Sequence, residues 1–181
     1  MPLGDSNKRN EQGLALNADL QPGSGAWDYI TWGQLSQVFP FRPSMSLNLT
    51  AIYSGKGIND DYLGSQTYQF GNELQLALGI SERITVGNNI FDPAITLRYR
   101  NQREDVIDDF DVPSTGGNWL FVNPSLSYWA TPDISFEVGL TIPVISHITG
   151  TQVTPTYRFR TGVFYRIPSK KESTNPYNIT F

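Results

Sequence analysis

The sequence has no cysteine, a single histidine and no long apolar run. Without cysteine the chain has no disulfide framework, no Cys-based metal site and no thiol catalysis. Nothing in it approaches the roughly 18 consecutive apolar residues of a membrane-spanning helix, so the sequence predicts no such helix. Strands of a transmembrane barrel are apolar on one side only, so they would leave no long apolar run.

Charged residues are also few, and their balance is mildly acidic. The 181 residues include 13 Lys and Arg against 17 Asp and Glu, for a formal net charge of −4. This balance makes a nucleic-acid partner unexpected, and the length suits one domain. The start of the chain, from Met1 to Arg9, is polar and lacks the apolar centre of a secretion signal. We expect either that such a signal has been removed or that the chain is a fragment of a longer protein.

The dominant pattern in the sequence is strict alternation of apolar and polar residues, which is the side-chain period of a β-strand. In the clearest run, 134–144, every even-numbered residue is apolar. The pattern predicts about seven strands of ~11–14 residues, longer than the ~5–6 usual in soluble domains and suited to tilted membrane strands. The expected strands are 26–39, which alternates least clearly, 44–54, 68–80, 92–100, 119–129, 134–144 and 157–167.

The connections between these expected strands alternate in length. Short turns are expected at 40–43, 81–83 and 131–133, and longer polar connections at 55–66, 101–118 and 145–155. This alternation is typical of outer-membrane barrels, which have short periplasmic turns and longer extracellular loops. We therefore predict an all-β, antiparallel, up-and-down transmembrane β-barrel in the bacterial outer membrane, with about seven or eight strands present. Its expected parts are a polar extension or extracellular loop over 1–25, barrel strands over 26–167 and a tail over 168–181.

The strand count predicts a difficulty with closure. If the short turns are periplasmic, the last strand ends in the periplasm and the first begins outside. A closed single-chain barrel has an even number of strands and both termini in the periplasm, so these strands cannot close alone. Three explanations stay open: the chain is the C-terminal part of a larger barrel, other chains complete it, or a strand before Gln21 escapes detection. The last residues, 177–181, are compatible with a barrel-assembly signal or with an ordinary tail.

If the apolar faces meet lipid, the alternate faces line a lumen. Charged side chains are tolerated there because the lumen is wet, whereas an Arg on the lipid face would cost roughly 2–4 kcal/mol at the midplane. One interpretation is a positively biased constriction that favours anionic or aromatic solutes. The other is that charges pair across strands and plug a narrow barrel, with Glu137 near Arg166 as the expected pair. The predicted lumen-lining residues are Asn48, Glu73, Gln75, Arg98, Arg100, Glu137, Arg158, Arg160 and Arg166.

Candidates for metal binding and catalysis are few. The acidic segment 104–111 has carboxylates of the kind that bind Ca²⁺, but it lacks the spacing of an EF-hand, and a solvated loop is the competing interpretation. A histidine-dependent catalytic site would have to use His147, which follows Ser146 directly. We predict no enzymatic activity, no metal site and no cofactor.

Four segments resemble a family of bacterial outer-membrane transporters grouped with the meta-pathway phenol-degradation barrels. The resemblance covers about residues 16–167 and implies a barrel in outer-membrane lipid that moves small solutes without catalysis. Members of the family are typically longer, with a signal peptide and further strands ahead of the first of these segments. The segments are Leu20-Gln-Pro-Gly-Ser-Gly-Ala-Trp-Asp28, Tyr68-Gln-Phe-Gly-Asn-Glu-Leu-Gln-Leu76, Ser114-Thr-Gly-Gly-Asn-Trp-Leu120 and Gly150-Thr-Gln-Val-Thr-Pro-Thr-Tyr-Arg158.

Two other functions compete with a channel. One is a structural or partner-binding barrel subunit of a larger envelope complex, whose lumen is plugged by charge pairs and which other protein chains complete or flank. The other is a soluble antiparallel barrel that binds a small apolar ligand. The soluble barrel would reverse the two faces, with apolar residues inward and Arg outward.

Overall fold

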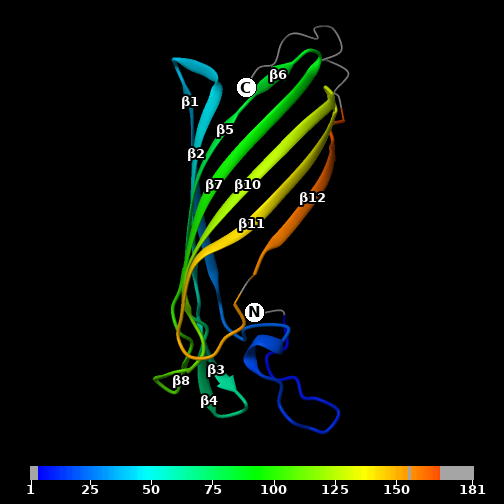
Figure 1. Cartoon of the computed structure of the whole chain (residues 1–181). Coiled ribbons are helices and arrows are strands. Elements are labelled where there is room, and N and C mark those ends of the chain that lie inside the picture. Colours follow the sequence, from blue (N-terminus) through cyan, green and yellow to red (C-terminus); the bar gives the residue numbers. More distant parts are fainter. Residues whose placement is uncertain (1–3, 155, 168–181) are drawn as a thin grey trace.

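Antiparallel strands form nearly all the regular structure in the computed structural model, which describes residues 4–154 and 156–167 (Figure 1). Strands that follow one another along the chain pair side by side, which confirms an all-β antiparallel meander. No helix among the described residues is long and apolar enough to cross a membrane. The main sheet has the order β1 (Tyr29–Phe39), β2 (Arg42–Gly55), β5 (Glu73–Glu82), β7 (Asn89–Gln102), β10 (Gly117–Thr131), β11 (Ile134–Ile148) and β12 (Arg158–Tyr165), and β6 (Ile84–Val86) also pairs with β7.

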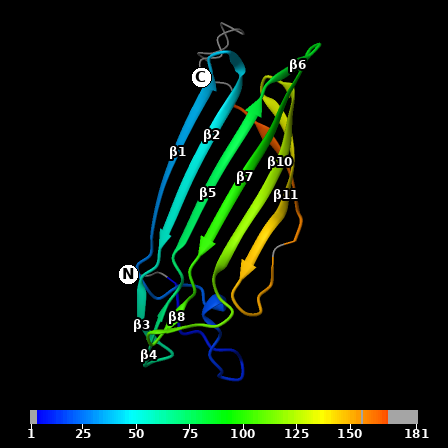
Figure 2. The same cartoon turned by 60° about the vertical axis from the view of Figure 1, so that its left-hand side comes forward.

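The main sheet is curved but open. Within the described residues β1 pairs only with β2, and β12 pairs only with β11. Figures 1 and 2 show the two edge strands on opposite sides of a long, twisted sheet. The described strands therefore do not close by themselves, as their odd number predicts, and the described residues form no complete barrel.

The register of the strand pairs divides the main sheet into two faces. Residues that lie opposite one another in successive strand pairs form a row across the sheet. One such row, through β1, β2, β5, β7, β10 and β11, is entirely apolar. The next row, displaced by one residue along each strand, contains Thr50, Arg98 and Phe121. Because side chains alternate between the faces of a strand, these two rows point to opposite sides of the sheet. We call the first the apolar face and the second the polar face. The apolar row consists of Leu35, Leu49, Leu78, Leu97, Val122 and Ile142.

The apolar face of the main sheet is not covered by other parts of the described chain. Leu35 is 71% exposed, Leu78 is 46% exposed and Phe159 is 70% exposed. Monomeric soluble proteins rarely leave an apolar surface of this extent open to water. The face therefore needs an apolar environment from outside the described structure.

The buried apolar cluster lies at one end of the strands. There, β3 (Ile58–Tyr62), β4 (Gln66–Gln69), β8 (Val106–Ile107) and β9 (Phe110–Asp111) form a second, small sheet. Ala18, at the start of the short 3₁₀ helix η1 (Ala18–Leu20), is buried together with Tyr62 and Tyr68. We call residues 4–28, 56–72 and 103–116 the loop-end cap, which lies at the bottom of Figures 1 and 2. The short turns of the main sheet lie at the opposite end.

The structure corrects two expected boundaries. The expected strand 68–80 is two strands, because the chain leaves the small sheet after Gln69 and enters the main sheet at Glu73. The expected turn at 81–83 is wrong, because the chain stays in register with β7 through β6 and turns at 87–88. Pro93 lies in β7 where this pairing is interrupted, and proline has no N–H to donate to the ladder. Gly87 has φ 62°, a conformation that glycine adopts freely in a tight hairpin turn.

Gly71, between β4 and β5, allows the chain to pass from the small sheet to the main one. A Cβ at this position would lie 1.9 Å from the carbonyl oxygen of Arg103. We therefore predict that Gly71→Ala destabilises the folded state by about 1–3 kcal/mol, the usual cost of overpacking. Urea unfolding followed by circular dichroism measures the effect. Gly33→Ala is the matched control, because nothing lies within 4 Å of the added Cβ, and an equal loss in both variants would contradict the prediction.

Candidate functional site: an arginine-lined cavity on the polar face

Residues of five strands and of the connection before β12, most of them polar, surround a cavity of about 160 Å³. β7 contributes Arg98 and Arg100 from alternate positions, so both point to the same side of the sheet. Because one cavity is lined from β5 through to β12, the polar face is the concave one. The lining residues are Glu73, Gln75, Arg98, Arg100, Phe121, Thr141, Thr156 and Arg158.

Aromatic side chains of β10 lie against the arginines of β7. Arg98 is opposite Phe121 in the register and Arg100 is opposite Trp119. The guanidinium carbon lies 4.8 Å from the ring centroid in the first pair and 5.1 Å in the second, within the range of cation–π contacts. Trp119 and Phe121 are both buried. These stacks hold two cationic side chains against the wall of the sheet.

The ion pairs leave two cavity arginines without a carboxylate. Arg100 donates to Glu73 at 2.7 Å, and Gln75 also donates to Glu73. Among the described residues, neither Arg98 nor Arg158 has a carboxylate oxygen within 4.0 Å. Arg98 Nε is buried and has no hydrogen-bond partner in this part of the chain. The cavity wall therefore carries more positive than negative charge.

The nine predicted lumen residues fall into three places. Glu73, Gln75, Arg98, Arg100 and Arg158 line the cavity. Asn48 lies outside it on β2, where it accepts a hydrogen bond from the Ser36 hydroxyl at 2.6 Å. Glu137 and Arg160 lie on β11 and β12, also outside the cavity lining, and Arg166 lies just past the end of β12.

The expected pairing of Glu137 with Arg166 is wrong. Arg160 donates to Glu137 at 2.6 Å, whereas Arg166 Nε lies 3.4 Å from Asp133. The register places Glu137 opposite Gly162, so Arg166 is carried past the start of β11. The prediction failed because the two strands do not begin to pair directly at their connection. β11 continues to Ile148, whereas its last residue paired with β12 is Thr141, and this difference shifts the register.

The sequence interpretation missed the aromatic partners of the arginines. Trp119 and Phe121 interrupt the alternation of their strand, because both are apolar at polar-face positions. The sequence did contain a signal for their position: Trp119 and Phe121 have odd numbers, as the polar residues Asn123 and Ser125 of the same strand do, and so lie on the same face. Their pairing with Arg98 and Arg100, however, depends on a register between strands that the pattern of one strand does not contain.

The two remaining sequence candidates do not join this cavity. His147 is opposite Asn118, and Ser146 is opposite Trp119, so the two neighbours point to opposite faces of the sheet. In the acidic segment 104–111, Asp105 is turned inward and Asp108 accepts a hydrogen bond from the Thr67 amide at 2.8 Å. Within residues 4–154 and 156–167, no group of three or more His, Cys, Asp or Glu side chains is placed to hold a metal ion.

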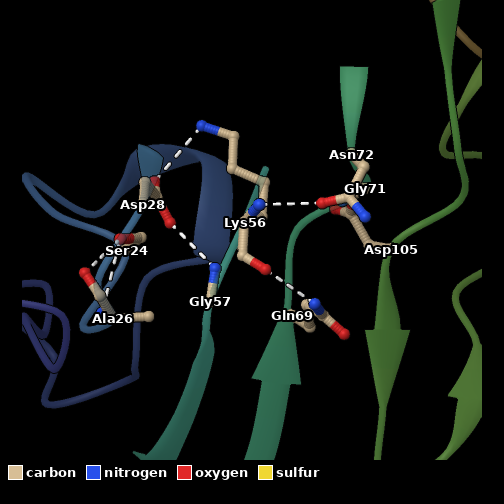
Figure 3. A network of polar contacts seen from close by, with 9 residues as sticks. All are labelled: Ser24, Ala26, Asp28, Lys56, Gly57, Gln69, Gly71, Asn72 and Asp105. Atoms are coloured by element: carbon tan, nitrogen blue, oxygen red, sulfur yellow. Dashed lines mark hydrogen bonds and ion pairs between the residues drawn. The ribbon is translucent and has the colours of Figure 1, made fainter. Parts of the chain in front are cut away.

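A second polar network ties the loop-end cap to the start of the cavity. Lys56 is its centre: its amide donates to Asn72 Oδ1 at 2.7 Å, its carbonyl accepts from Gln69, and its ammonium lies 3.2 Å from Asp28 (Figure 3). Asp28 also accepts from the amide of Gly57 at 3.1 Å. The network joins the entry to β1, the exit from β2 and the approach to β5.

Asp105 is a buried carboxylate that the sequence placed in a solvated loop. It is 3% exposed and accepts hydrogen bonds from the Tyr68 hydroxyl and the Gly71 amide, each at 2.7 Å. Burial and, after it, the hydrogen bond to Asp105 raise the pKa of the Tyr68 phenol far above its ordinary value of 10.0. Asp105 therefore has a structural role in the cap.

Comparison with known proteins leaves the family open. A scan against protein-family models and a search of the curated proteins both found no match. The resemblance to outer-membrane transporters therefore stays a prediction from the four segments given above.

Removal of the Asp105 carboxylate should weaken the cap. Asp105→Ala leaves the Tyr68 hydroxyl and the Gly71 amide without their acceptor, and we expect a loss of about 1–3 kcal/mol for each buried group that stays unpaired. Urea unfolding followed by circular dichroism measures this loss. Asp111→Ala removes the same charge from an exposed position of the same loop. Equal unfolding midpoints for the two variants would contradict the structural role.

Proposed function

We propose that the chain supplies transmembrane strands of a bacterial outer-membrane channel or transporter for small solutes, without enzymatic activity. The observation that carries this proposal is the contrast between an exposed apolar convex face and a polar concave face on the same strands. A transmembrane barrel needs this arrangement, because its outer surface meets lipid and its lumen is wet. The long strands β2, β5, β7, β10 and β11 have 10 to 15 residues each, which is enough for a tilted membrane strand of ~9–11 residues.

The position of the faces favours a membrane barrel over a soluble one. A soluble barrel with an apolar ligand inside would carry its apolar rows on the concave face and its arginines outside. In this chain Arg98, Arg100 and Arg158 line a concave cavity, and the leucine rows are convex. The physical reason is that the convex apolar face needs an apolar surrounding and the concave polar face needs water. A barrel in a membrane, with lipid outside and water in its lumen, provides both.

The proposal includes an orientation and a closing partner. The loop-end cap would face outward and the short turns would face the periplasm, as in known outer-membrane barrels. A spanning sheet cannot leave the backbone groups of edge strands unpaired in lipid. Further strands, from the same polypeptide or from other chains, would therefore pair with β1 and β12.

A second function is favoured by the ion pairs on the polar face. Glu73 on β5 pairs with Arg100 on the neighbouring strand β7, and Glu137 on β11 pairs with Arg160 on the neighbouring strand β12. Such pairs would narrow a lumen, as expected for a structural or partner-binding subunit of a larger envelope complex. A plugged barrel of this kind would insert into membranes without conducting.

The membrane location has a direct test. We expect the protein to need detergent for solubility and to migrate faster in gels before heating than after it, because folded barrels bind less detergent and stay compact. The apolar face explains the detergent requirement. A chain that stays folded and monomeric in plain buffer would contradict both the channel and the plugged subunit.

Conductance in planar bilayers separates a channel from a plug. A channel should give discrete conductance steps with a preference for anions, because the cavity wall is positive. Arg98→Glu and Arg158→Glu should each move the reversal potential in a salt gradient toward cation selectivity. Arg42→Glu is the control, since Arg42 is paired with Glu82 at the short-turn end. A conducting pore whose selectivity neither cavity variant alters would show that these arginines do not guide ions.

A further inference from the structure

We propose that the cavity on the polar face is a binding site for one small oxyanion, a carboxylate or inorganic phosphate, held between Arg98 and Arg158. The proposal deepens the channel function by naming its solute class, and its permeation test rests on that function. Its binding test does not, because the site is built from the described residues alone.

The charges of the cavity wall leave a place for one anion. Three guanidinium groups line the cavity against one carboxylate, Glu73, and that carboxylate is engaged by Arg100. Arg98 and Arg158 have no carboxylate within 4.0 Å among the described residues. Like charges on one partly enclosed wall repel each other, and a bound anion would relieve that repulsion.

The orientation of Arg98 suits an oxyanion. Phe121 lies against the guanidinium of Arg98 with 4.8 Å from the guanidinium carbon to the ring centroid. A guanidinium group donates hydrogen bonds only from its edge, in a planar fork that matches the oxygens of a carboxylate or phosphate. Arg98 Nε is buried and unpartnered in the described structure, and a buried donor without an acceptor is costly. Because Nε is closed to solvent, an oxyanion in the cavity would be bound by the terminal amino groups of the fork and not by Nε.

The other lining groups and the cavity size narrow the class further. Thr141 and Thr156 contribute hydroxyl groups that can donate to an oxyanion, and Gln75 is already committed to Glu73. The volume of about 160 Å³ is about five times the share of one water molecule in the liquid, ~30 Å³. Phosphate or a short carboxylate fits such a space together with a few waters.

The binding test uses the full chain in detergent at low ionic strength. Inorganic phosphate and acetate are titrated separately by isothermal calorimetry against a chloride background, and saturable binding of either is expected. Arg98→Gln and Arg158→Gln should each weaken it by about tenfold, the usual effect of losing a charged hydrogen bond. Glu73→Gln should strengthen it, because the competing carboxylate is gone. A preference for phosphate over acetate, or the reverse, distinguishes the two oxyanions.

Controls keep loss of folding apart from loss of the site. Arg42→Gln removes one positive charge at the short-turn end and should bind as the wild type does. Each variant is used only if its circular dichroism spectrum and its unfolding midpoint match those of the wild type. Absence of saturable binding in the wild type, or equal affinity in the wild type and both arginine variants, would overturn the site.

The permeation test shows which proposal fails. If the wild type conducts, phosphate or acetate should reduce the chloride current, and Arg98→Gln should relieve that block by the same factor as it weakens binding. Binding without any conductance would support the anion site and contradict the channel. Conductance without saturable binding would support the channel and contradict the anion site.

Discussion

The register of the antiparallel strand pairs decides which environment each side chain of the main sheet meets. Because the side-chain period of a strand is two, a slip of one residue would move Leu78 and Leu97 to the concave face and Arg98 to the convex one. In the proposed membrane barrel, an arginine on the lipid-facing surface would cost roughly 2–4 kcal/mol at the midplane. The apolar row and the arginine row therefore specify the same register, and each reinforces the other.

The loop-end cap supports this register at one end of the strands. Its contacts run from the entry to β1 through Lys56 to Asn72, and Glu73 follows Asn72 directly. The residue that pairs with Arg100 is therefore anchored by a neighbour that the cap holds in place. The buried apolar cluster of the cap also explains how a sheet whose long strands expose their apolar face can still have one well-packed end.

Prediction from sequence succeeded where the information was local and failed where it was not. The alternation identified every long strand of the main sheet. It placed a turn too early at 81–83 because charged residues interrupt the pattern there, although the Gly87-Asn88 pair carries a hairpin signal. Five of the nine predicted lumen residues came together in the cavity, since all lie on one face. The partner of Glu137 was wrong because it depends on the length and asymmetry of a connection.

The sequence by itself determined the strands, their antiparallel order and the division of their side chains into an apolar and a polar set. These follow from the spacing of neighbouring residues, which the backbone of any strand imposes. The tertiary structure decided which arginines stack on Phe121 and Trp119 and which pair with Glu73 and Glu137. It also decided which arginines have no carboxylate partner among the described residues. Within the part of the chain that the structure describes, it also left β1 and β12 at open edges. These outcomes depend on register and curvature across several strands, and no single strand encodes them.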